Sequence, residues 1–204
     1  MQNVAQTLGS YMYDEVYGSI EMMSMATALS MPLAFVVLIG GPIVANKVGL
    51  EKMIRIGLFC SFGIYVLLFG MHAVMDVNIW VHIIMSSLGS GLCSLSVQMQ
   101  WGLVGEAIDY NEYVTGKRTE GSIYGTFNLT RRIGNTIGTS SALALLAITG
   151  YVSGAATQAP SVIFGIKVLC VLLPGIFALG SWVAFKFVWN ITPEIREKVA
   201  AFKA

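Results

Sequence analysis

Two long apolar runs of this chain are joined by the charged stretch Glu106-Ala-Ile-Asp-Tyr-Asn-Glu-Tyr-Val-Thr-Gly-Lys-Arg-Thr-Glu-Gly121. The run that follows carries Arg131 and Arg132 side by side, about ten residues or roughly 15 Å along a helix. An arginine near the centre of a bilayer costs roughly 2.5 to 3.5 kcal/mol on insertion scales. Charges at that depth indicate a cavity, a partner or a solute path, because plain lipid would exclude them.

The composition indicates a membrane protein. The chain has 204 residues, of which 55% are apolar and 11% charged, with a mean hydropathy of +0.72. Apolar runs of about 20 residues cross a hydrocarbon core about 30 Å thick as helices, whereas a membrane barrel would show short alternating strands. The sequence therefore predicts an all-α, polytopic membrane helix bundle. Its net charge of +1 indicates neither a nucleic-acid partner nor an acidic one.

Five full membrane spans are expected, covering residues 18–45, 53–74, 79–104, 122–150 and 161–189. The connection at 46–52, the stretch 106–121 and the tail after residue 189 contain lysine or arginine, whereas 72–78 and 151–160 contain neither. Basic connections are usually cytoplasmic. We therefore expect a multi-pass protein of the cytoplasmic membrane with its C-terminus in the cytoplasm.

Residues 1–18 read like the outer end of a further helix. Tyr11, Tyr13 and Tyr17 form an aromatic group of the kind that gathers at membrane interfaces. The chain is therefore expected to begin inside a helix, as a natural fragment, a truncated reading frame or a deliberately cut piece would.

Small residues recur in the third and fourth spans. In the fourth they form the pairs Gly121/Gly125 and Gly134/Gly138, and in the third they are Ser86, Ser87, Gly89, Ser90, Gly91, Ser94 and Ser96. Small side chains let the backbones of neighbouring membrane helices approach closely. We therefore expect these positions to lie at helix contacts.

The fourth span has a polar stripe when it is drawn as a helix with 100° per residue. Within about 60° of one another lie Tyr124, Asn128, Asn135 and Thr139. Arg131 and Arg132 flank this stripe, so both can lean toward one polar cavity. The alternative is that the two arginines pair with carboxylates or carbonyls of neighbouring helices for structure alone.

Gln98 and Trp101 are three residues apart in the third span and can share a helix face. An amide and an aromatic ring suit a sugar, through hydrogen bonds to its hydroxyl groups and stacking on its apolar face. The alternative is that Trp101 anchors the helix at the membrane interface.

The charged stretch itself combines both signs. Acidic residues recur every three positions at Glu106, Asp109 and Glu112, and Lys117, Arg118 and Glu120 follow across the turn. Such charges can form ion pairs that close a cytoplasmic mouth in one state and release it in another. The alternative is a solvated loop, since an exposed pair contributes only about 0 to 1 kcal/mol.

Signs of an enzyme or a metal site are missing from the sequence. His72 and His82 flank a neutral turn without helical spacing, and no HExxH, Walker loop or GxSxG motif occurs. We therefore expect no catalytic activity, no metal site and no covalently bound cofactor.

A family resemblance enters at the charged stretch. Asp109-Tyr-Asn-Glu-Tyr-Val-Thr-Gly-Lys-Arg-Thr-Glu-Gly121, then Tyr124, then Arg131-Arg-Ile-Gly134 resembles the pattern of the glycoside-pentoside-hexuronide cation symporters, to which melibiose permease belongs. The likeness extends along nearly the whole chain. This chain departs from the family pattern with Asn111 for glycine, Val114 for a basic residue, Glu106 for aspartate and Arg132 for lysine.

The resemblance implies the C-terminal half of a twelve-helix major facilitator fold, so residues 1–204 would form one half-domain with five full spans and the end of a sixth. It implies sugar or glycoside symport by alternating access, driven by sodium or protons. The coupling cation and much of the sugar contact would lie mainly in an N-terminal half, which would be this half's partner in the lipid. Arg132 would be the cavity cation, and Asp109 to Glu120 the cytoplasmic loop.

The expected function is therefore cation-coupled sugar or glycoside symport, carried out as one half of a full transporter and inactive alone. The second hypothesis is a non-transporting regulatory or assembly subunit derived from a carrier half. The identity of the sugar and the choice between sodium and protons stay open.

Overall fold

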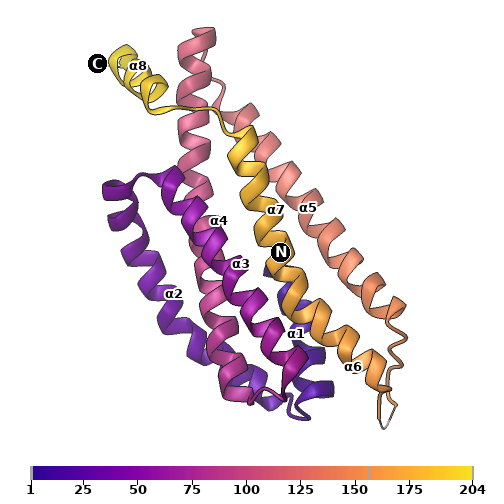
Figure 1. Ribbon diagram of the computed structural model, residues 1–204. Coiled ribbons are helices and arrows are strands. Elements are labelled where there is room, and N and C mark those ends of the chain that lie inside the picture. The colour runs from indigo at the N-terminus through magenta and orange to yellow at the C-terminus, as the bar shows by residue number, and fades with distance from the viewer. Residues whose placement is uncertain (1, 156, 204) are drawn as a thin grey trace.

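The computed structural model describes residues 2–155 and 157–203, and side chains except at 2–5, 33, 34, 37, 38, 42 and 46. All regular elements in these ranges are helical, which confirms the all-α prediction (Figure 1). They are α1 (Gln2–Tyr11), η1 (Met12–Val16), α2 (Glu21–Val48), α3 (Leu50–Val74), α4 (Ile79–Thr115), α5 (Glu120–Ile148), α6 (Pro160–Lys167), η2 (Val168–Leu172), α7 (Leu173–Val188) and α8 (Pro193–Lys203). The elements η1 and η2 are single π-helical turns.

Three helical stretches in the described part of the chain are long and apolar enough to cross a membrane: Leu50–Val74, Ile79–Thr115 and Pro160–Val188. Each begins within a few residues of an expected span. The helices α2 and α5 form where the other two spans are expected. Neither is among the three stretches above, and α5 is too polar to be counted with them. The crossing of the membrane by α2 and α5 stays a prediction.

The helix α4 is longer than the span expected at 79–104, because it continues to Thr115. The acidic part of the charged stretch is therefore helix, and only the turn after it is irregular. Gly116 ends the helix with φ +66°, and its N–H donates to the Glu112 carbonyl at 2.8 Å. A left-handed residue at this position is the usual way to stop a helix, and glycine adopts it without strain.

The helix α3 lies between α4 and α7, with α2 packed on α4 and α1 on α5 (Figure 1). In Figure 1, α2 and α5 occupy opposite edges of the bundle. We call the end that carries α8, the turn at Gly49 and the turn at Gly116 the α8 end. One buried apolar cluster surrounds Leu68 and Ile166 beside η1, and a second surrounds Leu58 and Leu103.

Tyr65 of α3 fills the space left by two glycines. Its ring lies against Gly89 of α4, and its Cβ lies 2.9 Å from where a Cβ on Gly175 of α7 would be. Nearby, the Ser61 hydroxyl donates to the Gly89 carbonyl at 2.8 Å. Small residues thus let three helices meet closely, as expected for the third span.

In the fourth span the same expectation is wrong at Gly121, Gly125 and Gly134, and at Gly138 it stays a prediction. A Cβ added at Gly121, Gly125 or Gly134 would meet nothing within 4 Å. The physical reason is that long side chains, such as Tyr124 and Phe127 against Trp101, bridge α5 to α4, so the backbone at these three glycines has no close neighbour among the described residues.

Gly175→Ala should destabilise the bundle, because the added methyl group would collide with Tyr65. Overpacking of this kind costs roughly 1–3 kcal/mol. Gly180→Ala on the same helix is the matched control, since nothing lies within 4 Å of its Cβ position. Thermal unfolding of the purified protein in detergent measures both, and equal midpoints for the two variants would contradict the close approach of α3 and α7.

Candidate functional site

The helix α5 exposes most of its length, with only Ala142 and Leu146 fully buried. Tyr124, Asn128, Arg131 and Arg132 are exposed, and Asn135 is half-buried. Two guanidinium groups on such a face are costly next to lipid tails. This face of α5 is therefore suited to water or to further protein, but not to lipid.

An aromatic and cationic group joins α5 to α4. The Trp101 ring stacks on Tyr124 with centroids 6.3 Å apart, and the Phe127 ring meets it edge-on at 5.3 Å. The Arg131 guanidinium carbon lies 5.7 Å from the Trp101 ring centroid. We call these four residues the Trp101 cluster. It offers exposed aromatic surface and guanidinium donors side by side, which is the equipment that recognises a sugar ring or an acidic substituent.

The predicted pathway residues divide into two groups. Trp101, Tyr124 and Arg131 come together, whereas Gln98, Asn128, Arg132 and Asn135 are not part of the Trp101 cluster. The Asn128 amide donates to the Tyr124 carbonyl of its own helix at 3.0 Å. Among the described residues neither Arg131 nor Arg132 has an ion pair, so no carboxylate of this part of the chain balances their charge.

Phe127 is a member of the Trp101 cluster that sequence reasoning missed. It lies three residues after Tyr124 and four before Arg131, which places all three on neighbouring positions of one helix face. That spacing was a usable signal, but an apolar residue in an apolar run does not stand out.

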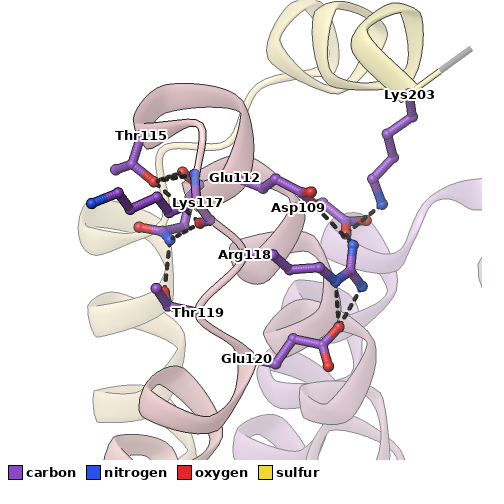
Figure 2. A network of polar contacts seen from close by, with 9 residues as sticks. Asp109, Glu112, Thr115, Lys117, Arg118, Thr119, Glu120 and Lys203 are labelled. Atoms are coloured by element: carbon purple, nitrogen blue, oxygen red, sulfur yellow. Dashed lines mark hydrogen bonds and ion pairs between the residues drawn. The ribbon is translucent and has the colours of Figure 1, made fainter.

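At the α8 end, Arg118 lies among carboxylates, as Figure 2 shows. Its Nη1 lies 2.8 Å from Glu112 Oε2 and 3.9 Å from Asp109 Oδ1, and its Nε donates to Glu120 Oε1 at 2.5 Å. The hydrogen bonds to Glu120 and then to Glu112 raise the pKa of the Arg118 guanidinium above its usual value. Lys203 of α8 reaches the same Asp109 Oδ1 at 2.5 Å.

Lys117 is in a different position from its neighbour Arg118. Its contacts are made by its backbone: the carbonyl accepts from the Asn111 amide and the Thr115 hydroxyl, both at 3.3 Å. Its ammonium group has no ion pair within the described part of the chain. Asn111 also donates to the Thr119 hydroxyl at 2.9 Å, so this departure from the family glycine braces the turn.

A second set of ion pairs lies beside the first and was not predicted. Arg196 of α8 contacts Glu106 at 2.9 Å and Glu51 at 3.9 Å, and Arg55 contacts Glu51 at 2.6 Å. We call both sets together the α8-end network. It connects α3, α4, the turn before α5, the first residue of α5, and α8. The sequence signalled only that these segments are charged, because partners 90 residues apart cannot be paired from spacing.

The two histidines meet at the other end of α3 and α4. His72 Nε2 lies 3.2 Å from His82 Nδ1, and the Tyr17 ring lies against both. Within the described ranges no three or more histidine, cysteine, aspartate or glutamate side chains are placed to hold a metal ion together.

A cavity of about 280 Å³ lies between α1, α2 and α4, and sequence reasoning missed it. Its polar lining includes Thr27 and Ser30 from α2, and Ser87 and Ser90 from α4. From the sequence these serines are expected only to be small packing residues. Their hydroxyl groups line a cavity because α2 packs on α4, which the sequence pattern alone does not show.

Comparison with known proteins agrees with the interpretation of this chain as part of a membrane transporter. The profile of the family described as MFS/sugar transport protein matches residues 1–192. The chain is 30% identical over 154 residues to a glucuronide carrier protein homolog of Escherichia coli K12, covering 72% of this chain and 31% of that protein. It is 26% identical over 192 residues to the uncharacterized symporter YjmB of Bacillus subtilis 168, covering 94% and 41%.

A candidate glycoside/cation symporter of Escherichia coli K12, YagG, is 27% identical over 85 residues, covering 42% of this chain and 18% of that protein. No solved structure matches the chain at a significant level. The chain spans less than half the length of these three relatives. The matches indicate a transporter and not an enzyme, and they agree with the resemblance noted in the charged stretch. The chain is a membrane protein that belongs to the MFS/sugar transport protein family.

Proposed function

We propose that this chain is the C-terminal half of a cation-coupled sugar or glycoside symporter of the cytoplasmic membrane. The observation that carries the proposal is the exposed polar face of α5 with its two arginines. The family match supports sugar transport, and the names of the relatives include a glucuronide carrier and symporters.

The argument from α5 is energetic. The helix has 29 residues, or roughly 43 Å, which is enough to cross a bilayer. Its Arg131 and Arg132 lack carboxylate partners in the described residues, and polar groups facing hydrocarbon are unfavourable. Another part of the carrier or an aqueous path must therefore cover this face. A solute pathway between two halves supplies both.

The remaining parts of the proposal concern the rest of the carrier. The relatives are more than twice as long as the region they share with this chain, which leaves room for an N-terminal half. We assign the residues that coordinate the coupling sodium ion or proton mainly to that half. Alternating access would then move the two halves against each other around a site near the bilayer midplane.

We place the α8 end in the cytoplasm. It carries Lys47, Lys52 and Arg55, the pair Lys117 and Arg118, and the basic residues of α8. The turns at the other end, 75–78 and 149–159, contain no lysine or arginine. Basic residues concentrate on the cytoplasmic side of multi-pass proteins. The α8-end network would then form part of the inner gate.

A second candidate function is a non-transporting regulatory or assembly subunit derived from a carrier half. The uncovered face of α5 would suit docking to another membrane protein equally well. The DNA upstream of the first codon discriminates the two: an in-frame N-terminal half supports the symporter, and an independent transcript supports the subunit.

Expressed by itself, the chain should give no sugar accumulation, because the coupling residues and one wall of the pathway are proposed to lie elsewhere. Co-expression with a matching N-terminal half should restore measurable uptake of radiolabelled sugar. Robust accumulation by the chain alone would overturn the assignment as half of a carrier.

In the full carrier, Arg132→Ala should abolish coupled uptake or weaken it by roughly tenfold or more, because an unpaired cation beside the pathway is lost. Arg132→Lys should keep part of the activity, since it keeps the charge but not the guanidinium geometry. Lys186→Ala is the control. This exposed lysine of α7 lies over the Trp182 ring and is not part of the Trp101 cluster. Normal uptake and affinity in Arg132→Ala would remove Arg132 from the pathway.

Neutralising Lys117 and Arg118 together should alter the transport rate more than substrate affinity. Arg118 forms ion pairs with carboxylates of the α8-end network, whereas the Lys117 ammonium group forms none among the described residues, so we attribute the expected effect to Arg118. We therefore expect Arg118→Gln to reproduce the double change and Lys117→Gln to behave like the parent. Uptake measured over a range of sugar concentrations separates the maximal rate from KM. A change confined to KM would contradict a gating contribution.

A further inference from the structure

The cavity between α1, α2 and α4 has a particular chemical character. Its floor is apolar, formed by Leu68, Val171 and Pro174. Its lining also carries hydroxyl groups from α2 and α4, and among the described residues that line it there is no lysine, arginine, aspartate or glutamate. The lining is therefore largely apolar, with hydroxyl groups set into it. Its volume of about 280 Å³ is close to the lower end of the range for small-molecule sites.

The hydroxyl groups are oriented by their own helices. The hydroxyl of Thr27 donates to the Met23 carbonyl at 2.9 Å, and that of Ser30 to the Thr27 carbonyl at 2.8 Å. On the facing helix, Ser86 donates to Ile83 at 3.2 Å and Ser90 donates to Ser87 at 3.1 Å. Because these four hydroxyl hydrogens are donated to backbone carbonyls, the hydroxyl oxygens interact with a ligand as hydrogen-bond acceptors.

This arrangement selects the class of ligand. An anion would find no lysine or arginine among the described lining residues, and a purely apolar ligand would remove the hydroxyl groups from water without replacing their hydrogen bonds. A neutral ring with many hydroxyl groups donates to the oxygens and places its apolar face against the floor. The lining therefore fits the uncharged part of a sugar or glycoside.

The cavity and the Trp101 cluster lie on one face of α4. Ser90 and Trp101 are eleven residues apart, which corresponds to about 20° around the helix and roughly 16 Å along it. Trp101 is 44% exposed on this face. The hydroxyl cavity and the Trp101 cluster therefore follow one another along one face of α4.

We propose that this cavity is a second contact region for the substrate, which holds a neutral, polyhydroxylated part of the sugar by hydrogen bonds to Thr27, Ser30 and Ser90. The proposal rests on the proposed function as a sugar carrier and deepens it. It assigns recognition of uncharged hydroxyl groups to α2 and α4, at a distance from the arginines of α5.

The test uses the full carrier and two radiolabelled probes, methyl β-D-glucuronide and methyl β-D-glucoside. The double variant Ser30→Ala/Ser90→Ala should raise KM by roughly two- to tenfold for each lost hydroxyl, with less effect on the maximal rate. Its matched control is Ser181→Ala on α7, whose hydroxyl also bonds to its own helix, donating to the Phe177 carbonyl at 2.8 Å. Ser181 is exposed and lies outside the cavity lining.

A second pair of variants tests volume. Ser90→Leu should block the cavity and reduce binding of both probes severalfold, whereas Ser181→Leu should leave it unchanged. Immunoblots of the membrane fraction show that all variants are inserted. Deoxy analogues of the glucoside test the hydrogen bonds directly, because altered packing would not change the preference between an analogue and the glucoside. The parent carrier should discriminate against the analogue that lacks the contacting hydroxyl group. Ser30→Ala/Ser90→Ala should lose that discrimination.

The outcomes separate the two proposals. If both serine variants keep the parental KM while Arg132→Ala abolishes uptake, the cavity proposal is wrong and the symporter proposal stands. If the unmodified carrier neither binds nor accumulates either probe, the proposed function fails for these sugars, and the cavity proposal falls with it. A raised KM with lost discrimination supports both.

Discussion

The bundle depends on the close approach of three helix backbones around Tyr65. The Tyr65 ring fills the space that a side chain larger than glycine would need at position 89, and the Tyr65 Cβ does the same at position 175. The Ser61 hydroxyl donates a hydrogen bond to the Gly89 carbonyl. In a bilayer, apolar side chains gain little by leaving lipid, so contact between helices has to come from fit and from such hydrogen bonds. The contact fixes α4 against α3, and α4 contributes residues to the cavity, to the Trp101 cluster and to the α8-end network.

Three chemically different regions follow one another on α4. Near its start are the hydroxyl groups of the cavity, then comes Trp101 with its aromatic and cationic neighbours from α5, and the last turns carry Glu106, Asp109 and Glu112. The first two suit a polar solute. The third belongs to the α8-end network, in which charges from α3, α4, α5, α8 and the turn before α5 lie within ion-pair distance. One helix therefore connects the proposed substrate contacts with the proposed gate.

Much of the fold was predictable because the apolar runs have the length of a bilayer crossing and the polar breaks between them are clear. The end of α4 was not, since Glu106 to Thr115 look like a loop by polarity but contain no residue that stops a helix before Gly116. Within the candidate site, the spacing of Tyr124 and Arg131 predicted a shared face correctly. Partners on other helices, such as Glu106 with Arg196 or Thr27 opposite Ser90, depend on tertiary packing that no local pattern encodes.

The length of α4 has a mechanical consequence. Its 37 residues extend over roughly 55 Å, whereas a bilayer with its headgroups is about 40–45 Å thick, so the helix is longer than an upright crossing requires. No proline interrupts it. A rod of this kind that rocks about a point near its middle moves its two ends in opposite directions. The serine end and the acidic end would then move at the same time and in opposite directions. Such a movement would couple opening on one side of the membrane to closure on the other, without requiring the loops to change conformation.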